Sequence, residues 1–276
     1  MRKIPFYIVD AFSTIRFQGN PASVCLMDTE IPEATMQAIA AEMNHSETAF
    51  TLSIDGGPTL GKRFSLRWFT PAVEVPLCGH ATLATAAVIL YELANPAQAI
   101  RFETKSGTLS ARREGSRITL DFPAADCRGA TPPPEVCAAL GAEGVIAACY
   151  AREDRNLLLQ LGSESEVRDL APDFRRLEAA RGEERFHGII VTAHSSGQFD
   201  FISRYFAPWL GIDEDPVTGA AHCALAPYWA RLTGKHEMRA YQASRRGGEM
   251  TVRVRGERVE LAGEAVTVAA GTIRLD

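Results

Sequence analysis

Two short stretches of this sequence place a small polar residue and a glycine directly in front of an apolar segment. They are Pro76-Leu-Cys-Gly-His-Ala81 and Pro216-Val-Thr-Gly-Ala-Ala221. Each pattern predicts a buried helix that begins at its glycine. The first N–H groups of a helix have no partner within the helix, and the helix dipole favours a negative charge beside them. Two such helix starts could hold one small carboxylate between two domains. Two ordinary helix caps in a duplicated fold explain the spacing equally well.

A glutamate lies where a predicted helix ends and an apolar strand begins, in Asn44-His-Ser-Glu-Thr-Ala-Phe50. Burial of Glu47 there would raise its pKa toward the range that suits a general base. Glu47 is therefore a candidate proton carrier, with a structurally paired carboxylate as the alternative. Asp215 could be a charge placed at a helix start for its dipole. By itself, His80 is expected to be a structural histidine.

The sequence contains two copies of one unit of about 138 residues. Phe64-Ser-Leu-Arg-Trp-Phe-Thr-Pro71 recurs as Phe201-Ile-Ser-Arg-Tyr-Phe-Ala-Pro208, and Gly107 and Gly115 recur as Gly248 and Gly256. Two copies make a duplicated domain pair and not a solenoid. The expected N-terminal domain is 1–123 and the expected C-terminal domain is 124–263.

Periodicity in the first copy predicts a set of short strands and two helices. The strands are expected at 4–12, 21–27, 47–54, 63–69, 100–105, 108–113 and 117–122. A first helix is expected at 32–43, with Asn44 as its C-cap, and a second from Gly79 to before Pro96. This second helix is apolar nearly all round, so its own domain must enclose it. The expected fold is α+β, with two pseudo-symmetric domains that each wrap a barrel-like sheet around a central helix.

Composition excludes several classes of protein. A chain that is 46% hydrophobic with a net charge of −5 can form a sizeable core and has no basic footprint for nucleic acid or an anionic membrane. The longest apolar stretch, 81–94, is too short to span a bilayer. The six cysteines form no CxxC pair, so we expect reduced thiols, no disulfide framework and a cytoplasmic protein. The partner expected from this composition is a small molecule.

Taken together, these motifs resemble the phenazine biosynthesis-like (PhzF-like) family and, more distantly, the diaminopimelate epimerase superfamily. The stretches that carry the resemblance are Asp10-Ala-Phe12, Gly19-Asn-Pro-Ala22, Ser46-Glu-Thr-Ala-Phe50, Trp68-Phe-Thr-Pro71, Cys78-Gly-His-Ala-Thr82 and Glu214-Asp-Pro-Val-Thr-Gly-Ala-Ala-His-Cys223. They extend over almost the whole chain in the family's order. The resemblance implies two similar domains with the active site between them, the first of them completed by a C-terminal strand at 264–276.

The resemblance also implies roles for individual residues. Glu47 would be the acid/base of a cofactor-independent isomerase that moves a proton on a small anionic, carboxylate-bearing metabolite, with His80 and Asp215 as its catalytic polar partners. The expected substrate-binding residues are Asn20, Ser46, Cys78, Gly79, Thr218, Gly219 and Ala220. No cofactor is expected. No metal site is expected either, because the Cys78–His80 and His222–Cys223 pairs lack finger-like spacing and have no obvious carboxylate ligand. A homodimer is the working expectation for the assembly.

Two departures from the family pattern leave alternatives open. The family often has serine where this chain has Ala220, so a hydroxyl is missing. In the epimerase relatives two cysteines face each other, whereas here Cys78 has Thr218 as its counterpart, and a threonine hydroxyl is too weak an acid to carry a proton at pH 7. A catalytically inactive binding or regulatory protein is therefore the main alternative. An epimerase that uses Cys78 together with Glu47 is a weaker one.

Overall fold

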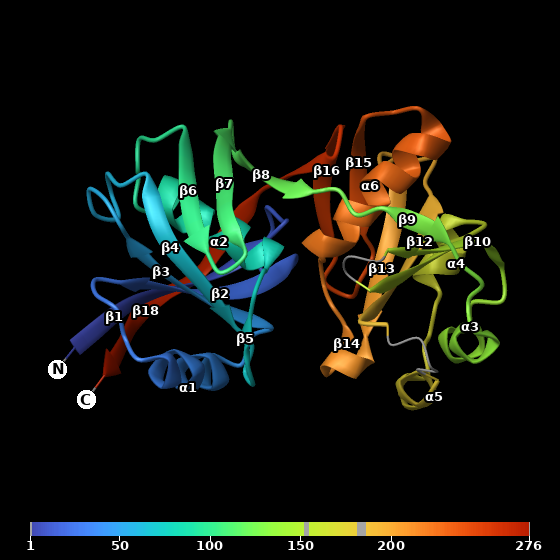
Figure 1. Cartoon of the computed structure of the whole chain (residues 1–276), viewed down its shortest axis with the longest axis horizontal. Helices are drawn as coiled ribbons and strands as arrows, with labels where there is room; N and C mark the ends of the chain where they lie inside the picture. The colour runs from blue at the N-terminus through green and yellow to red at the C-terminus, as the bar shows by residue number, and fades with distance from the viewer. Residues whose placement is uncertain (1, 152–154, 181–185, 276) are drawn as a thin grey trace. The chain divides into compact units, whose positions relative to one another are not determined.

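The computed structural model describes residues 2–151, 155–180 and 186–275, and the chain divides into two compact units. The first unit comprises Met1–Asp121 and Leu261–Asp276, and the second comprises Phe122–Glu260. Each unit is described by itself below (Figure 1).

The first unit contains two helices, a π-helical segment and a set of short strands. Its strands are β1 (Arg2–Ala11), β2 (Asn20–Met27), β3 (Glu47–Ser53), β4 (Arg63–Phe69), β5 (Glu74–Val75), β6 (Ala99–Thr104), β7 (Gly107–Glu114), β8 (Arg117–Pro123) and β18 (Ala265–Leu275). Its helices are α1 (Glu33–Met43) and α2 (Gly79–Ala87), and α2 continues as the π-helical segment η1 (Val88–Glu92). The strands match the predicted ranges to within two residues, except β5, which was not predicted.

The sheet of the first unit surrounds α2, as predicted (Figure 1). β2 pairs with β1 in antiparallel and with β3 in parallel orientation, β4 follows antiparallel to β3, and β6 lies parallel to β4. Every residue of α2 after Gly79 is buried, and the helix contacts β1, β2, β3 and β18. The C-terminal strand β18 pairs antiparallel with β1 from Arg2↔Leu275 to Ala11↔Ala265. The last strand of the chain therefore belongs to the first unit.

The second unit has the same alternation of parallel and antiparallel pairs. Its strands are β9 (Cys127–Gly129), β10 (Val145–Ala151), β11 (Asn156–Leu161), β12 (Gly188–His194), β13 (Phe201–Ala207), β14 (Ile212–Glu214), β15 (Glu237–Gln242), β16 (Gly248–Arg255) and β17 (Arg258–Gly263), of which β17 crosses the boundary of the unit as β8 does. Its helices are α3 (Pro134–Leu140), α4 (Glu164–Arg168), α5 (Phe174–Ala179) and α6 (Gly219–Thr233), with the 3-10 segment η2 (Pro208–Leu210). β11–β12 and β13–β15 are parallel, like β2–β3 and β4–β6. The topology confirms the duplicated α+β fold.

Local signals in the sequence predicted the helix that precedes Glu47. α1 buries Met36, Ile39 and Ala40 against its unit, and its C-cap is Asn44 in the left-handed conformation with φ 50°, as predicted. Asparagine tolerates this conformation better than most residues, so the chain can leave the helix sharply and enter β3. Glu47 is the first residue of that strand.

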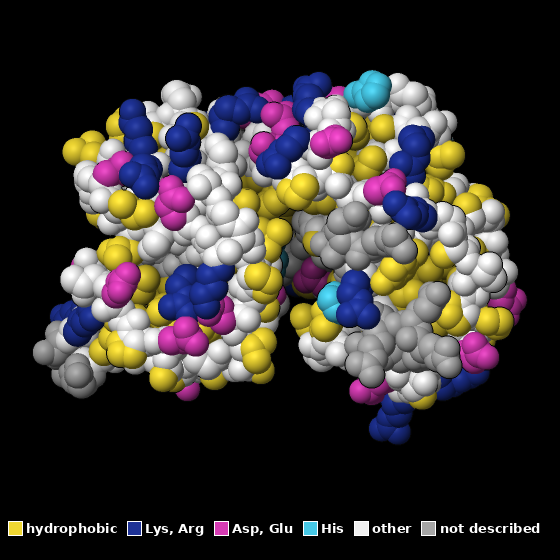
Figure 2. Space-filling view, viewed as in Figure 1, with side chains coloured by type: hydrophobic (Ala, Val, Ile, Leu, Met, Phe, Trp, Pro, Cys, Tyr) yellow, Lys and Arg dark blue, Asp and Glu magenta, His cyan; other side chains and the backbone are white. Residues whose placement is uncertain are grey.

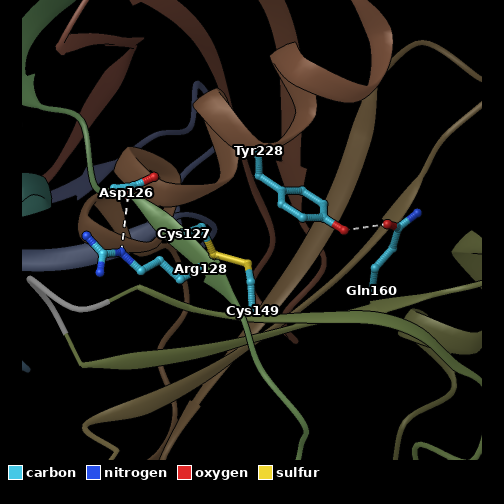
Figure 3. The surroundings of a disulfide bond; sticks show 6 residues. All are labelled: Asp126, Cys127, Arg128, Cys149, Gln160 and Tyr228. Atoms are coloured by element: carbon cyan, nitrogen blue, oxygen red, sulfur yellow. Dashed lines mark hydrogen bonds and ion pairs between the residues drawn. A yellow bond between two sulfur atoms is a disulfide. The ribbon is translucent and has the colours of Figure 1, made fainter.

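The expectation of reduced thiols is wrong for one pair of cysteines. Cys127 of β9 and Cys149 of β10 form a disulfide, with Cα atoms 5.6 Å apart (Figure 3). β9 and β10 pair antiparallel, with Cys127 opposite Ala151 and Cys149 opposite Gly129. The two cysteines are 22 residues apart in the sequence, and no local signal indicated that their strands are neighbours. Among the described residues, Cys25, Cys78, Cys137 and Cys223 take no part in a disulfide.

The surface in view mixes both signs of charge. Figure 2 shows Lys and Arg side chains interspersed with Asp and Glu, without a broad field of one sign. Among the described residues, no helix is both long and apolar enough to cross a lipid bilayer.

Candidate active site

Glu47 lies at the N-terminal end of β3, with its side chain 15% exposed. Burial raises the pKa of the Glu47 carboxyl, because the charged form loses solvation, while hydrogen bonds that Ser46 and Cys78 donate to it act in the opposite direction. Burial has the larger effect. A carboxylate with a raised pKa is a stronger base than an ordinary surface glutamate.

His80, the second residue of α2, connects the polar residues around Glu47. Its Nε2 atom is 3.3 Å from the Glu47 carboxylate and 3.3 Å from the Ser46 hydroxyl. Its Nδ1 atom is 3.2 Å from the amide nitrogen of Asn20 and 3.5 Å from the sulfur of Cys78. Nδ1 thus faces the Asn20 amide, and Nε2 faces Glu47. His80 is thus part of the polar cluster and not an isolated core histidine.

The turn before β2 positions Asn20. Gly19 has φ 68°, and a Cβ on it would collide with the carbonyl oxygen of Ala11. Only glycine fits this close approach without displacing the backbone. Asn20 follows as the first residue of β2, fully buried, and its amide reaches His80 across 60 residues of sequence.

The structure thus brings five of the predicted site residues together in the first unit. They are Asn20, Ser46, Glu47, Cys78 and His80. Three of them, Glu47, Cys78 and His80, each offer one metal-ligating atom, all within 4.8 Å of one another. Glu47 thus supplies, beside Cys78 and His80, a carboxylate that was not obvious as a possible metal ligand from the sequence.

In the second unit, the turn before α6 holds the predicted residues Asp215 and Thr218. The Thr218 hydroxyl donates to the Asp215 carboxylate over 2.5 Å. Gln242 of β15 accepts from the Thr218 N–H at 2.8 Å and donates to the Asp215 carbonyl at 2.7 Å. Ser244 donates to the Pro216 carbonyl at 2.8 Å. Side chains at the end of β15 and just after it therefore fix this turn at several points.

Sequence reasoning missed Gln242, although a signal for it exists. β15 alternates between exposed and buried positions, and Met238, Ala240 and Gln242 form its buried face. A glutamine in register with core residues must find hydrogen-bond partners. This alternation could have indicated that Gln242 binds a neighbouring backbone segment.

His222, in the first turn of α6, is a second buried histidine. Its Nδ1 donates to the Thr218 carbonyl at 2.7 Å, while its Nε2 is buried without a hydrogen-bond partner. The ring stacks on Phe201 at 6.1 Å. Loss of solvation lowers the pKa of His222 to about 4, so the ring is neutral at pH 7.

The two helix starts share one feature that favours anions. The N-cap residues are Cys78 for α2 and Thr218 for α6, and neither side chain accepts a hydrogen bond from the first N–H groups of its helix. A helix start of this kind favours an anion at the positive end of the dipole. Gly79 and Gly219 begin the two helices, and Ala220 is exposed on the first turn of α6.

The fold is a duplicated α+β fold in which each unit begins a buried helix at a glycine. The structure resembles that of a hydroxyproline epimerase from Agrobacterium vitis with bound trans-4-OH-L-proline, with a TM-score of 0.59 at 13% identity over 100% of this chain and 93% of that one. At this identity the likeness concerns the fold.

More similar proteins identify the family. The family described as phenazine biosynthesis-like protein matches residues 9–271. A protein of Pseudomonas aeruginosa named uncharacterized isomerase is 44% identical over 99% of this chain and 100% of its own length. The crystal structure of a PhzF family protein from Enterococcus faecalis has a TM-score of 0.91 and 40% identity, covering 99% of this chain and 100% of that one. The chain belongs to the phenazine biosynthesis-like family, and several of its relatives are named isomerases.

Proposed function

We propose that the protein is a cofactor-independent isomerase that uses Glu47 to move a proton on a small carboxylate-bearing metabolite. The observation that carries the proposal is the environment of Glu47: a carboxylate with a raised pKa, 3.3 Å from His80 and hydrogen-bonded by Ser46 and Cys78. Its partner His80 is a titratable imidazole and not a permanent cation such as arginine, so Glu47 can accept a proton without leaving a fixed charge unpaired.

The proposed step conserves atoms and electrons within the substrate and one side chain. The Glu47 carboxylate removes a proton from a carbon activated by a neighbouring carboxylate or double bond, and the electron pair moves into the conjugated system. The resulting carboxylic acid returns the proton to another carbon of the same molecule. No electron leaves the substrate, so the step requires no redox partner.

The start of α2, beside Glu47, is the proposed binding group for the substrate carboxylate in the first unit, and the start of α6 is a second candidate in the second unit. Their first N–H groups donate no hydrogen bond to an N-cap side chain. Preorganised backbone donors also stabilise the negative charge that develops when a carbon loses its proton. Asn20 and Ser46 contribute by holding His80, and Asp215 contributes through Thr218.

The contact between Cys78 and Glu47 argues for one base and not two. Two bases that invert a carbon must approach it from opposite faces, with the substrate between them. Cys78 instead donates a hydrogen bond to Glu47 directly. A pair in contact leaves no room for a substrate carbon, so single-base transfer through Glu47 is the mechanism that this geometry supports.

Proton exchange with solvent tests the proposal. Small acids with an activated C–H, L-proline and trans-4-hydroxy-L-proline among them, are incubated with the protein in D₂O, and NMR follows deuterium uptake. We expect Glu47→Gln to slow uptake by about 10²- to 10⁴-fold, the usual contribution of a positioned base. Glu42→Gln, an exposed glutamate on α1, serves as the matched control and is expected to leave the rate unchanged.

Equal uptake by wild type and Glu47→Gln would eliminate Glu47 as the proton carrier. An inactive binding protein remains the alternative, favoured by Ala220 and Thr218 at the start of α6. It predicts that the acids bind, as seen by shifts of their NMR signals, with no deuterium uptake in wild type.

A further inference from the structure

The cluster of Glu47, Cys78 and His80 combines a carboxylate, a thiol and an imidazole. Each offers one ligating atom, and the three atoms lie within 4.8 Å of one another. These are the three side-chain types that bind zinc in proteins. They come from β3, from the residue before α2 and from the first turn of α2, so the fold and not a short sequence motif gathers them.

Two distances in the cluster, each to a different nitrogen of the His80 ring, have the length of a ligand–ligand edge in a tetrahedral zinc site. Zinc bonds of about 2.3 Å to sulfur and 2.0–2.1 Å to nitrogen or oxygen give edges of about 3.6 Å between sulfur and nitrogen and about 3.3 Å between nitrogen and oxygen. The observed separations are 3.5 Å from the Cys78 sulfur to Nδ1 of His80 and 3.3 Å from Nε2 of His80 to the Glu47 carboxylate. The ring binds an ion through one nitrogen, so closure requires a movement of about 1 Å by Glu47 or Cys78 toward that nitrogen.

The ligand types select the class of ion. Thiolate and imidazole favour zinc and its late first-row neighbours, whereas magnesium and calcium prefer oxygen ligands alone. Three protein ligands leave a fourth position open to water or a substrate oxygen. The Glu47 side chain keeps 15% of its surface exposed, so the cluster is not sealed from solvent.

We propose that Glu47, Cys78 and His80 bind a zinc-class divalent ion, and that this ion switches the proton-transfer site off. On binding, the Cys78 thiol loses its proton to solvent, and its sulfur, one His80 nitrogen and one Glu47 oxygen donate lone pairs to the metal. Glu47 then has no free lone pair in place to remove a substrate proton. The inhibitory part rests on the proposed function, whereas the binding part does not.

Binding is tested on the full-length protein with cobalt(II) as a spectroscopic probe and zinc(II) as its competitor. We expect one equivalent of cobalt(II) to give a thiolate charge-transfer band in the near ultraviolet that zinc(II) abolishes. Cys78→Ser and His80→Gln should each weaken zinc binding by about 100-fold or more, because each removes a ligand. Cys223→Ser is the matched control, a buried free cysteine of α6, and should change the affinity less than about threefold.

Absence of the band, or a band unchanged in Cys78→Ser, would overturn the metal site. Circular dichroism of each variant shows whether it is folded, so that loss of the band can be assigned to the lost ligand. Loss of the band in both Cys78→Ser and His80→Gln supports the site independently of either single variant.

The inhibitory part is tested by deuterium uptake with saturating zinc and again after a chelator. Reversible loss of uptake supports the proposal, and unchanged uptake with zinc bound overturns its inhibitory part. If chelated wild-type protein shows no uptake while cobalt binds, the proposed function has failed and the metal site has not.

Discussion

In the first unit, α2 begins at Gly79, between Cys78 and His80, both of which contact Glu47. In the second unit, the helix that begins at Gly219 follows Thr218, whose hydroxyl and N–H bind Asp215 and Gln242. Both helices start at a glycine with an uncapped first turn. In the first copy, the titratable groups of Glu47, Cys78 and His80 lie together at the start of α2. In the second copy, hydroxyl and amide groups hold the turn before α6 in place.

A matched pair of positions one turn into each helix makes the same point. Thr82 donates its hydroxyl to the carbonyl of Cys78, and His222 donates its ring N–H to the carbonyl of Thr218. The two side chains thus make the same bond to the residue four positions earlier. The backbone geometry at the helix start is the property that both copies share, while the chemistry of the side chains has diverged.

The largest expected effect concerns the pH dependence of that matched pair. The folded pKa of His222 is about 4, below its unfolded value of 6.5, so the stability contributed by the neutral ring is fully present above pH 6.5 and is lost as the pH falls toward 4. Between pH 7 and pH 4, wild type should lose about 3 kcal/mol of its free energy of unfolding because of His222. His222→Thr, which introduces the threonine of the matching position in the first copy, should not show this loss. Urea unfolding at both pH values measures it. The exposed His236→Thr is the control, and a wild-type curve as flat as that of His222→Thr would refute the prediction.

Removing the side-chain amide of Gln242, which holds the turn before α6, should lower the stability of the protein. Gln242→Leu should lower the free energy of unfolding by about 2–3 kcal/mol, because it leaves the Thr218 N–H and the Asp215 carbonyl without their partner. Gln37→Leu, a half-buried glutamine that donates one bond to the Thr70 carbonyl, should cost less than about 1 kcal/mol. Urea unfolding of both variants provides the comparison. Equal costs would show that Gln242 does not hold the turn.

A charge placed at the start of α6 tests whether the second copy binds substrate. Ala220→Asp puts a carboxylate beside the first N–H groups, which suits the helix dipole and should not destabilise the protein. It should repel an anionic substrate and raise KM about tenfold, the effect of about 1.4 kcal/mol. Ala220→Asn is the neutral control. If KM for an acid found by deuterium uptake is the same in both variants, α6 does not bind its carboxylate.

The smallest expected effect is the stability cost of the buried Glu47 carboxylate. The folded pKa of Glu47 is raised, so stability falls as the pH rises from the unfolded value near 4.5 through the folded value. Glu47→Gln should therefore be more stable than wild type at pH 8, by on the order of 1 kcal/mol, with the difference disappearing below pH 4.5. Thermal unfolding across this pH range measures it, with Glu42→Gln as reference. A stability difference between Glu47→Gln and wild type that grows as the pH falls would contradict the prediction.

Local and repeated patterns in the sequence predicted much of the fold. Alternation located β1 to β4 and β6 to β8, and the apolar segment after Gly79 located the helix that the sheet encloses. Asn44 was identified as the C-cap of α1 because its preference for the left-handed conformation is a property of the residue itself. The duplication was visible because the matched motifs keep their order and spacing.

Pairings between distant segments could not be predicted in this way. The disulfide of Cys127 and Cys149 depends on two strands being neighbours, and Gln242 depends on a turn 24 residues earlier in the sequence. The carboxylate beside Cys78 and His80 comes from a strand that begins more than 30 residues earlier. Side-chain type and spacing specify what a residue can do, whereas tertiary packing decides which partner it meets.

The pairing of β18 with β1 has a consequence for synthesis on the ribosome. β1 is synthesised before the second unit, and its neighbour β18 is synthesised after the whole of it. Until β18 leaves the ribosome, β1 lacks this partner strand. A polypeptide that is interrupted before residue 265 therefore leaves the unit with Glu47 incomplete, even where the second unit has been made in full.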